Sequence, residues 1–119
     1  MDNELLHEKA MNAATSYLRL RGYEIEWTGW KGRIDTVDII ARDPLDTLCF
    51  IEVLACMGHM PAFDNCDVAM STWECIAGDY VESIEDFDDG VTIRFDTIGI
   101  DVRGEHRALL KYEKGRFNG

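Results

Sequence analysis

The chain has 119 residues, and 23 Asp and Glu against 12 Lys and Arg give it a net charge of −11. This length suits a single domain over residues 1–119. No apolar run approaches the ~18 residues that a membrane-spanning helix needs. Because the N-terminus is acidic and polar, unlike a secretion signal, we expect a cytoplasmic protein that does not associate with membranes.

The basic residues are unevenly distributed along the chain. Residues 43–93 contain no Lys or Arg, yet they hold twelve Asp and Glu. Nucleic-acid affinity depends on Lys and Arg that neutralise phosphates, so this composition argues against nucleic-acid binding outside a small basic patch. The acidic run 83–89 is expected as a solvated turn, and it also offers a contact for a basic protein partner.

Hydrophobic periodicity divides the chain into two helices and five strands, in the order helix, three strands, helix, two strands. Apolar residues spaced three and four apart predict helices over residues 3–21 and 66–84. The strands are expected over residues 23–27, 34–41, 47–55, 91–102 and 106–112.

Local signals predict where the first elements begin and end. Asn3 is expected to cap the first helix, and Gly22 follows its end. Gly29 and Gly32 indicate a turn after the first strand. Residues 57–65 contain both a Gly and a Pro and are expected to form a loop.

Two acids lie inside otherwise apolar strands, Asp38 in VDII and Glu52 in FIEV. They occupy the two arms of one predicted hairpin, so their carboxylates converge if the register agrees. Two close carboxylates repel each other unless a cation lies between them, and paired oxygen ligands suit hard ions such as Mg²⁺. The alternative is structural, with each acid hydrogen-bonded to a turn or paired with Arg33 or Arg42.

Four stretches of the chain carry a family resemblance, namely YLRLRGYEI (17–25), RIDTVDIIARDPLDTLCFIEV (33–53), RFDTIGI (94–100) and ALLKYEKGRF (108–117). They resemble the YraN-like family of endonuclease-related proteins. The resemblance implies an α/β, restriction-endonuclease-like fold, with an αβββαβ core and a mixed central sheet flanked by helices. It also implies a PD-(D/E)xK site, in which two acids hold Mg²⁺ or Mn²⁺ and a lysine orients or deprotonates the attacking water.

The resemblance assigns Asp38 and Glu52 as the two metal-binding acids, but it places Leu54 at the lysine position. A glutamate that the family carries on its first helix corresponds to Met11, and Glu8 lies one turn earlier. The resemblance with its departures therefore implies a degenerate member with impaired or lost nuclease activity. Such a protein would act as a binding or regulatory domain related to nucleic-acid processing.

Two other functions remain open from the sequence. One is an active Mg²⁺-dependent DNA endonuclease, in which Lys31, Arg33 or Arg42 supplies the missing cation from another element. The other is an acidic protein-interaction module unrelated to DNA, which would contact a basic partner through its acidic face.

Smaller features have alternative interpretations. Trp27 and Trp30 flank a glycine, and they suit either core packing or stacking on bases. Buried thiols are expected for the cysteines, and the alternative is a zinc site. The candidate zinc ligands are Cys56, His59, Cys66 and Cys75.

Overall fold

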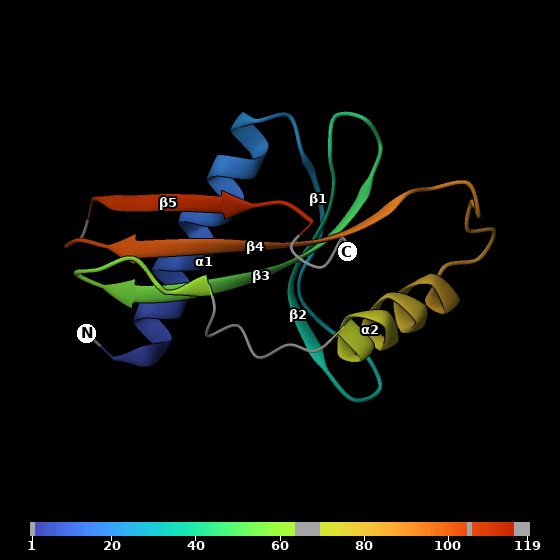
Figure 1. Cartoon of the computed structure of the whole chain (residues 1–119), viewed down its shortest axis with the longest axis horizontal. Helices are drawn as coiled ribbons and strands as arrows, with labels where there is room; N and C mark the ends of the chain where they lie inside the picture. The colour runs from blue at the N-terminus through green and yellow to red at the C-terminus, as the bar shows by residue number, and fades with distance from the viewer. Residues whose placement is uncertain (1, 64–69, 105, 116–119) are drawn as a thin grey trace.

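The computed structural model describes residues 2–63, 70–104 and 106–115. Within these ranges the helices and strands follow the predicted order (Figure 1). They are α1 (Asn3–Leu20), β1 (Glu24–Lys31), β2 (Thr36–Arg42), β3 (Leu48–Met57), α2 (Met70–Ser83), β4 (Ile93–Val102) and β5 (Ala108–Glu113).

The five strands form one sheet in the order β1-β2-β3-β4-β5. Neighbouring strands are antiparallel except for β3 and β4, which run parallel from the pair Leu48–Ile93 to the pair Met57–Val102. A parallel pair needs a crossover connection, and α2 lies in the chain between these two strands. This mixed sheet and its two helices agree with the restriction-endonuclease-like αβββαβ core expected from the resemblance.

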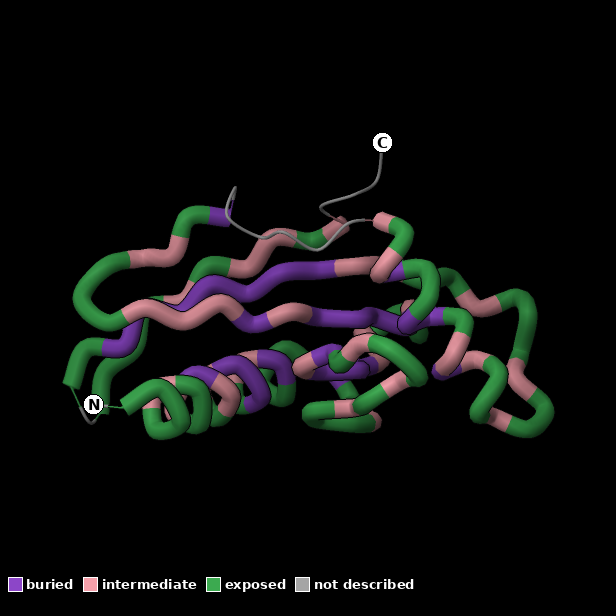
Figure 2. The backbone as a smooth tube through the Cα atoms, turned by 90° about the horizontal axis from the view of Figure 1, so that it is seen from below, coloured by how far each residue is buried: buried purple, intermediate pink, exposed green. Residues whose placement is uncertain are grey.

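Helix α1 covers one face of the sheet. Its fully buried residues Ala10, Ala14 and Leu18 follow the helical repeat and pack with Ile51 of β3 and Ile98 of β4. Figure 2 shows buried residues along the central strands and along the side of α1 that faces them. The small alanines allow the helix to approach the sheet closely. This interface is the larger of the two hydrophobic cores.

Helix α2 packs on the opposite face, against strands β2 and β3. Its buried Trp73 and Tyr80 join Ile40 of β2 and Phe50 of β3 in a second core. The Phe50 and Tyr80 rings meet edge to face at 5.8 Å between centroids. Because alternate β3 side chains point to opposite faces, this one strand contributes to both cores. Neither of the two described helices is long and apolar enough to cross a membrane.

Several predicted boundaries move in the structure. Asp2, and not Asn3, caps α1, since its carboxylate accepts the Leu5 N–H at 2.8 Å. The expected turn at Gly29 is wrong, because β1 continues through this residue with a φ of +61°, which glycine adopts without strain. The chain turns after β1 instead, over residues 32–35. Residues 66–69 of the second predicted helix lie outside the described ranges.

A buried ion-pair network joins β4 to its surroundings on the α1 side. Asp96 is fully buried, and Arg94 Nε donates to it at 2.9 Å while Arg94 Nη1 donates to Asp43 at 3.0 Å. Tyr112 donates its hydroxyl proton to Asp96, and Arg94 Nη2 donates to the Tyr23 hydroxyl at 3.1 Å. Burial and the charge of Asp96 raise the pKa of Tyr112, so it remains a proton donor. This network ties β4, β5 and the β2–β3 turn together.

Candidate active site

The site begins where strands β2 and β3 separate. Their paired residues run from Arg42–Leu48 to Ile39–Ile51. Asp38 precedes Ile39 on β2, just beyond the last of these pairs, and its Oδ2 accepts the N–H of Val53 on β3 at 2.7 Å. The carboxylate thus replaces a backbone carbonyl as the partner of β3, and this contact fixes Asp38 beside the strand that carries Glu52.

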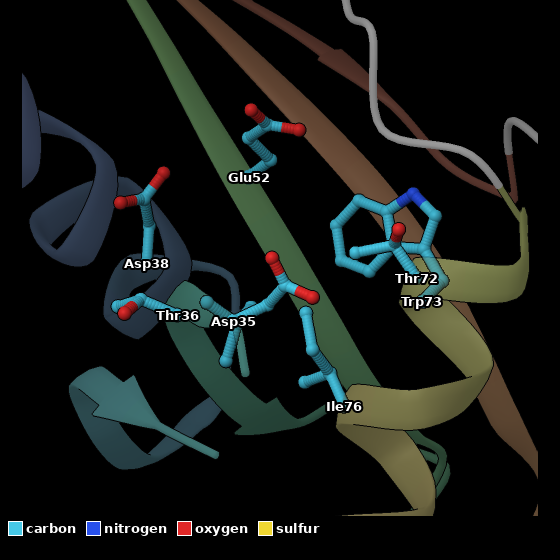
Figure 3. A pocket seen from close by; sticks show the side chains of 8 residues that line it. Asp35, Thr36, Asp38, Glu52, Thr72, Trp73 and Ile76 are labelled. Carbon is cyan, nitrogen blue, oxygen red and sulfur yellow. The ribbon is translucent and has the colours of Figure 1, made fainter. Parts of the chain in front are cut away.

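Asp38 and Glu52 line one cavity of about 170 Å³. Figure 3 shows Asp38 on the side nearer α1, Glu52 on β3, and Trp73 and Ile76 of α2 across from Asp38. The structure therefore brings the two predicted acids to the same cavity. They form its acidic side, and α2 forms an apolar wall. The lining residues are Asp35, Thr36, Val37, Asp38, Glu52, Thr72, Trp73 and Ile76.

The environment of Asp38 disfavours its ionised form. Burial raises its pKa, although the Val53 N–H and the charge of His7 act in the opposite direction. Only Asp38 Oδ2 has a hydrogen-bond donor within the described ranges. A cation in the cavity would compensate the carboxylate charge that burial destabilises.

The donor set fits a hydrated hard cation. Mg²⁺ keeps several water ligands and is commonly held by one or two carboxylates, which Asp38 and Glu52 supply. In the described part of the chain, no three His, Cys, Asp or Glu side chains are arranged to hold a metal ion, so water would complete its coordination. Thr97 of β4 pairs with Glu52 of β3 in the parallel register. Its hydroxyl is buried and lacks a hydrogen-bond partner among the described residues.

Leu54, at the lysine position, does not line this cavity. It lies two residues beyond Glu52 on β3 and borders a separate cavity of about 310 Å³ with Cys56, His59 and Met60. The position at which the resemblance expects a positive charge thus carries an apolar side chain. That side chain borders other residues than those that line the cavity of Asp38 and Glu52.

The arginines considered as substitutes for the lysine are engaged elsewhere. Arg33 forms ion pairs with Asp79 and Glu82 of α2. Arg42 Nε donates to Glu26 of β1 at 3.1 Å. Each guanidinium thus neutralises acids outside the cavity.

The other candidate residues lie around the site without lining it. Lys31 ends β1 and is exposed. Glu8 and Met11 of α1 border a different cavity together with His7. Of these α1 residues, His7 is the one whose charge acts on Asp38.

Sequence reasoning did not identify Asp35 and Thr72 as residues of this cavity. Asp35 lies in the turn before β2, three residues from Asp38 in RIDTVD, so a third nearby acid was visible in the sequence. Thr72 reaches the cavity only because α2 packs over β2 and β3, and no local pattern predicts that contact.

The structure gives little support to the zinc alternative. Cys56 and His59 border the same cavity, but Cys75 is exposed on α2 and Cys66 lies outside the described residues. The expectation of buried thiols holds for Cys49 and is wrong for Cys75.

The two tryptophans near Gly29 differ from each other. Trp30 packs in the α2-side core, with its ring edge to face with Tyr80 at 5.2 Å. Trp27 is 54% exposed, so core packing describes only Trp30.

Comparison with known proteins identifies the family of the chain. A comparison with curated proteins finds no significant match. The sequence model of the family described as "Uncharacterised protein family UPF0102" matches residues 11–100, which are well over half of the chain. The matched segment contains Asp38, Glu52 and Leu54. The chain therefore belongs to UPF0102, the YraN-like, endonuclease-related family of the restriction-endonuclease-like superfamily.

Proposed function

We propose that this protein is a nuclease-like domain that binds a divalent cation but has lost efficient phosphodiester cleavage. The observation that carries the proposal is the separation of Leu54 from the cavity that Asp38 and Glu52 line. The domain then serves nucleic-acid processing as a binding or regulatory component.

The acids retain half of the chemistry of metal-dependent hydrolysis. A bound Mg²⁺ or Mn²⁺ supplies a Lewis acid that activates water and stabilises charge on a phosphate. Asp38 and Glu52 would hold the ion, and the Val53 N–H orients the Asp38 carboxylate. Trp73 and Ile76 exclude water from one wall.

The other half of that chemistry requires a cation near the attacked phosphate. A leucine side chain neither donates a hydrogen bond nor accepts a proton, so Leu54 cannot orient the water or neutralise the phosphate. The exposed acid Glu74 also lies on α2, the helix that walls the cavity. Both features weaken binding of a phosphate backbone.

A second candidate, an active metal-dependent endonuclease, is favoured by one observation. The charge of His7 acts on Asp38 from α1. An imidazolium there would provide positive charge beside the metal-binding acids, in place of the lysine. The relocated cation would then be His7 and not Arg33 or Arg42.

Cleavage assays distinguish these two functions. Branched, nicked and single-stranded DNA are incubated with Mg²⁺ or Mn²⁺ and with the wild type, Asp38→Asn, Leu54→Lys and His7→Gln proteins. We expect no wild-type cleavage above the Asp38→Asn background, and none by Leu54→Lys, because position 54 borders a different cavity. Wild-type cleavage that disappears in Asp38→Asn would contradict the loss of activity, and its disappearance in His7→Gln would favour the second candidate.

Metal binding is measured separately by titration calorimetry with Mg²⁺ and Mn²⁺. We expect Asp38→Asn and Glu52→Gln to abolish binding. Asp88→Asn removes an exposed acid of the 84–90 turn and is the matched control that should bind normally. Absence of binding to the wild-type protein would refute the metal site itself.

A further inference from the structure

A cavity of about 220 Å³ lies on the α1 side of the sheet, where four segments of the chain meet. It is bordered by the end of α1, the loop into β1, the β2–β3 turn and the end of β5. It shares no lining residue with the cavity of Asp38 and Glu52. Its lining residues are Tyr17, Arg21, Tyr23, Pro44, Tyr112 and Lys114.

Three tyrosine rings form a fixed aromatic wall. The Tyr112 ring lies edge to face with Tyr17 at 6.0 Å and tilted against Tyr23 at 6.1 Å between centroids. The hydroxyls of Tyr23 and Tyr112 are anchored in the buried network of Arg94 and Asp96. Because their polar ends are held, these rings are preorganised and a ligand would order few side chains on binding.

Two cations lie over this wall. The Arg21 guanidinium is 5.1 Å from the centroid of the Tyr17 ring, and Lys114 Nζ is 5.8 Å from that of Tyr112. Both residues are exposed, and among the described residues neither forms an ion pair with a carboxylate. They are therefore available to an anion, in a chain whose net charge is −11.

The acids behind the tyrosines are already neutralised by other partners. Asp43 accepts from Arg94 and from two backbone N–H groups, those of Leu45 and Thr47. Asp96 accepts from Arg94 and Tyr112. The exposed charges that border the cavity are thus the two cations, and the buried acids oppose an incoming anion only weakly.

We propose that this cavity binds the terminal phosphate and adjoining ring of a nucleotide. Arginine matches phosphate oxygens with paired N–H donors and lysine adds a point charge, while the accessible parts of the tyrosine wall give apolar contact to the adjoining ring. The volume equals about seven waters at ~30 Å³ each, which suits one phosphate with part of a sugar or base. The nucleotide is either free or the end of a single strand. This site acts independently of metal binding at Asp38.

The test uses AMP, adenosine and inorganic phosphate, titrated into the full chain at low salt and followed by calorimetry and tyrosine ring NMR shifts. We expect AMP to bind and adenosine or phosphate alone to bind at least tenfold more weakly. Arg21→Gln and Lys114→Gln should each weaken AMP binding at least fivefold. Circular dichroism verifies that each variant folds.

The chain offers matched controls for charge removal. Arg19→Gln lies two residues before Arg21 and borders another cavity, and Lys111→Gln removes a lysine that lies over the Phe63 ring. Both should bind AMP normally. No AMP binding by the wild type, or equal losses in Arg19→Gln and Arg21→Gln, would overturn the proposal, because the second result indicates only general electrostatic attraction.

Oligonucleotides identify the source of the phosphate. A 5′-phosphorylated single strand that binds more tightly than AMP, with a 5′-hydroxyl strand at least tenfold weaker, assigns the site to strand ends. A phosphorylated strand no tighter than AMP assigns it to free nucleotides. Equal binding of the phosphorylated and hydroxyl strands would overturn recognition of a terminal phosphate. Asp38→Asn should leave AMP binding unchanged, so the failure of either site is seen separately.

Discussion

Replacing Asp96 by Asn tests whether the buried network on β4 holds the sheet together. Asp96 is fully buried, and its two oxygens accept hydrogen bonds from Arg94, from the Tyr112 hydroxyl and from the Gly115 N–H. Asn has nearly the same shape, but one of its two terminal groups is an NH₂ donor. At least one of these donors would therefore face another donor, and Arg94 would lose the charge that it neutralises.

The expected loss in the free energy of unfolding is about 3 kcal/mol. Removing one partner of a buried ion pair generally costs about 3–5 kcal/mol, and neither side chain here is screened by solvent, since Arg94 is 17% and Asp96 0% exposed. The lower end applies because Arg94 keeps Asp43 at 3.0 Å. A domain of this size has only about 5–15 kcal/mol of stability, so the effect would be large.

Urea denaturation followed by circular dichroism measures this change, with an unchanged m value indicating the same cooperative unfolding. Asp101→Asn is the matched control on the same strand. Asp101 is equally buried, but only Oδ2 has a donor within the described residues, from the half-exposed Arg103. We expect a loss below ~1 kcal/mol there. Equal losses for the two variants would refute the role of the network.

Three further substitutions or modifications test other contacts. In Gly99→Ala the added Cβ would lie 2.5 Å from the Phe63 ring, so we expect about 1–3 kcal/mol lower stability in urea; unchanged stability would contradict that packing. Burial raises the pKa of Cys49 to about 12, so iodoacetamide at pH 8 should modify the exposed Cys75 and spare Cys49 in the native protein, as read by peptide mass spectrometry; equal modification would contradict its burial. Burial raises the pKa of Asp38 in the native state above its value of ~3.9 in the unfolded state. At pH values above ~3.9 the native state therefore binds more protons than the unfolded state, and the free energy of unfolding falls as pH rises. Asp38→Asn should therefore unfold at higher urea than the wild type at pH 7 without metal, with the difference vanishing below pH ~3.9, and a less stable variant at pH 7 would contradict the sign.

The fold could be predicted from the sequence wherever one local repeat coincides with one buried face. The α1 positions Ala10, Ala14 and Leu18 repeat at helical spacing and are all buried, so the helix was correctly predicted to within one residue. Strand β1 was predicted too short, because Gly29 reads as a turn. In the structure this part of β1 is held by pairing with β2, including Trp30 with Val37, which no local pattern indicates.

Two lining residues of the candidate site could be anticipated from the sequence. Asp38 and Glu52 stand out as acids in apolar strands, and the hairpin register brings both to one cavity. The position of Leu54 could not be predicted, because the cavity that it borders also depends on a chain segment beyond β3, which brings in His59 and Met60. A sequence pattern gives the order of residues on a strand, but not what covers that strand.

Acids inside the strands give the same sequence signal but different structural outcomes. Asp96 has a cation two residues earlier on its own face and accepts from the Tyr112 hydroxyl and the Gly115 N–H, so it is a structural acid. Asp38 has one backbone N–H, a raised pKa and a place on a cavity wall. Burial of a carboxylate is unfavourable unless its charge is compensated. Of these two acids, only Asp96 has its charge compensated by a cation of the protein itself. That difference is the physical reason to expect a cation at Asp38 and none at Asp96.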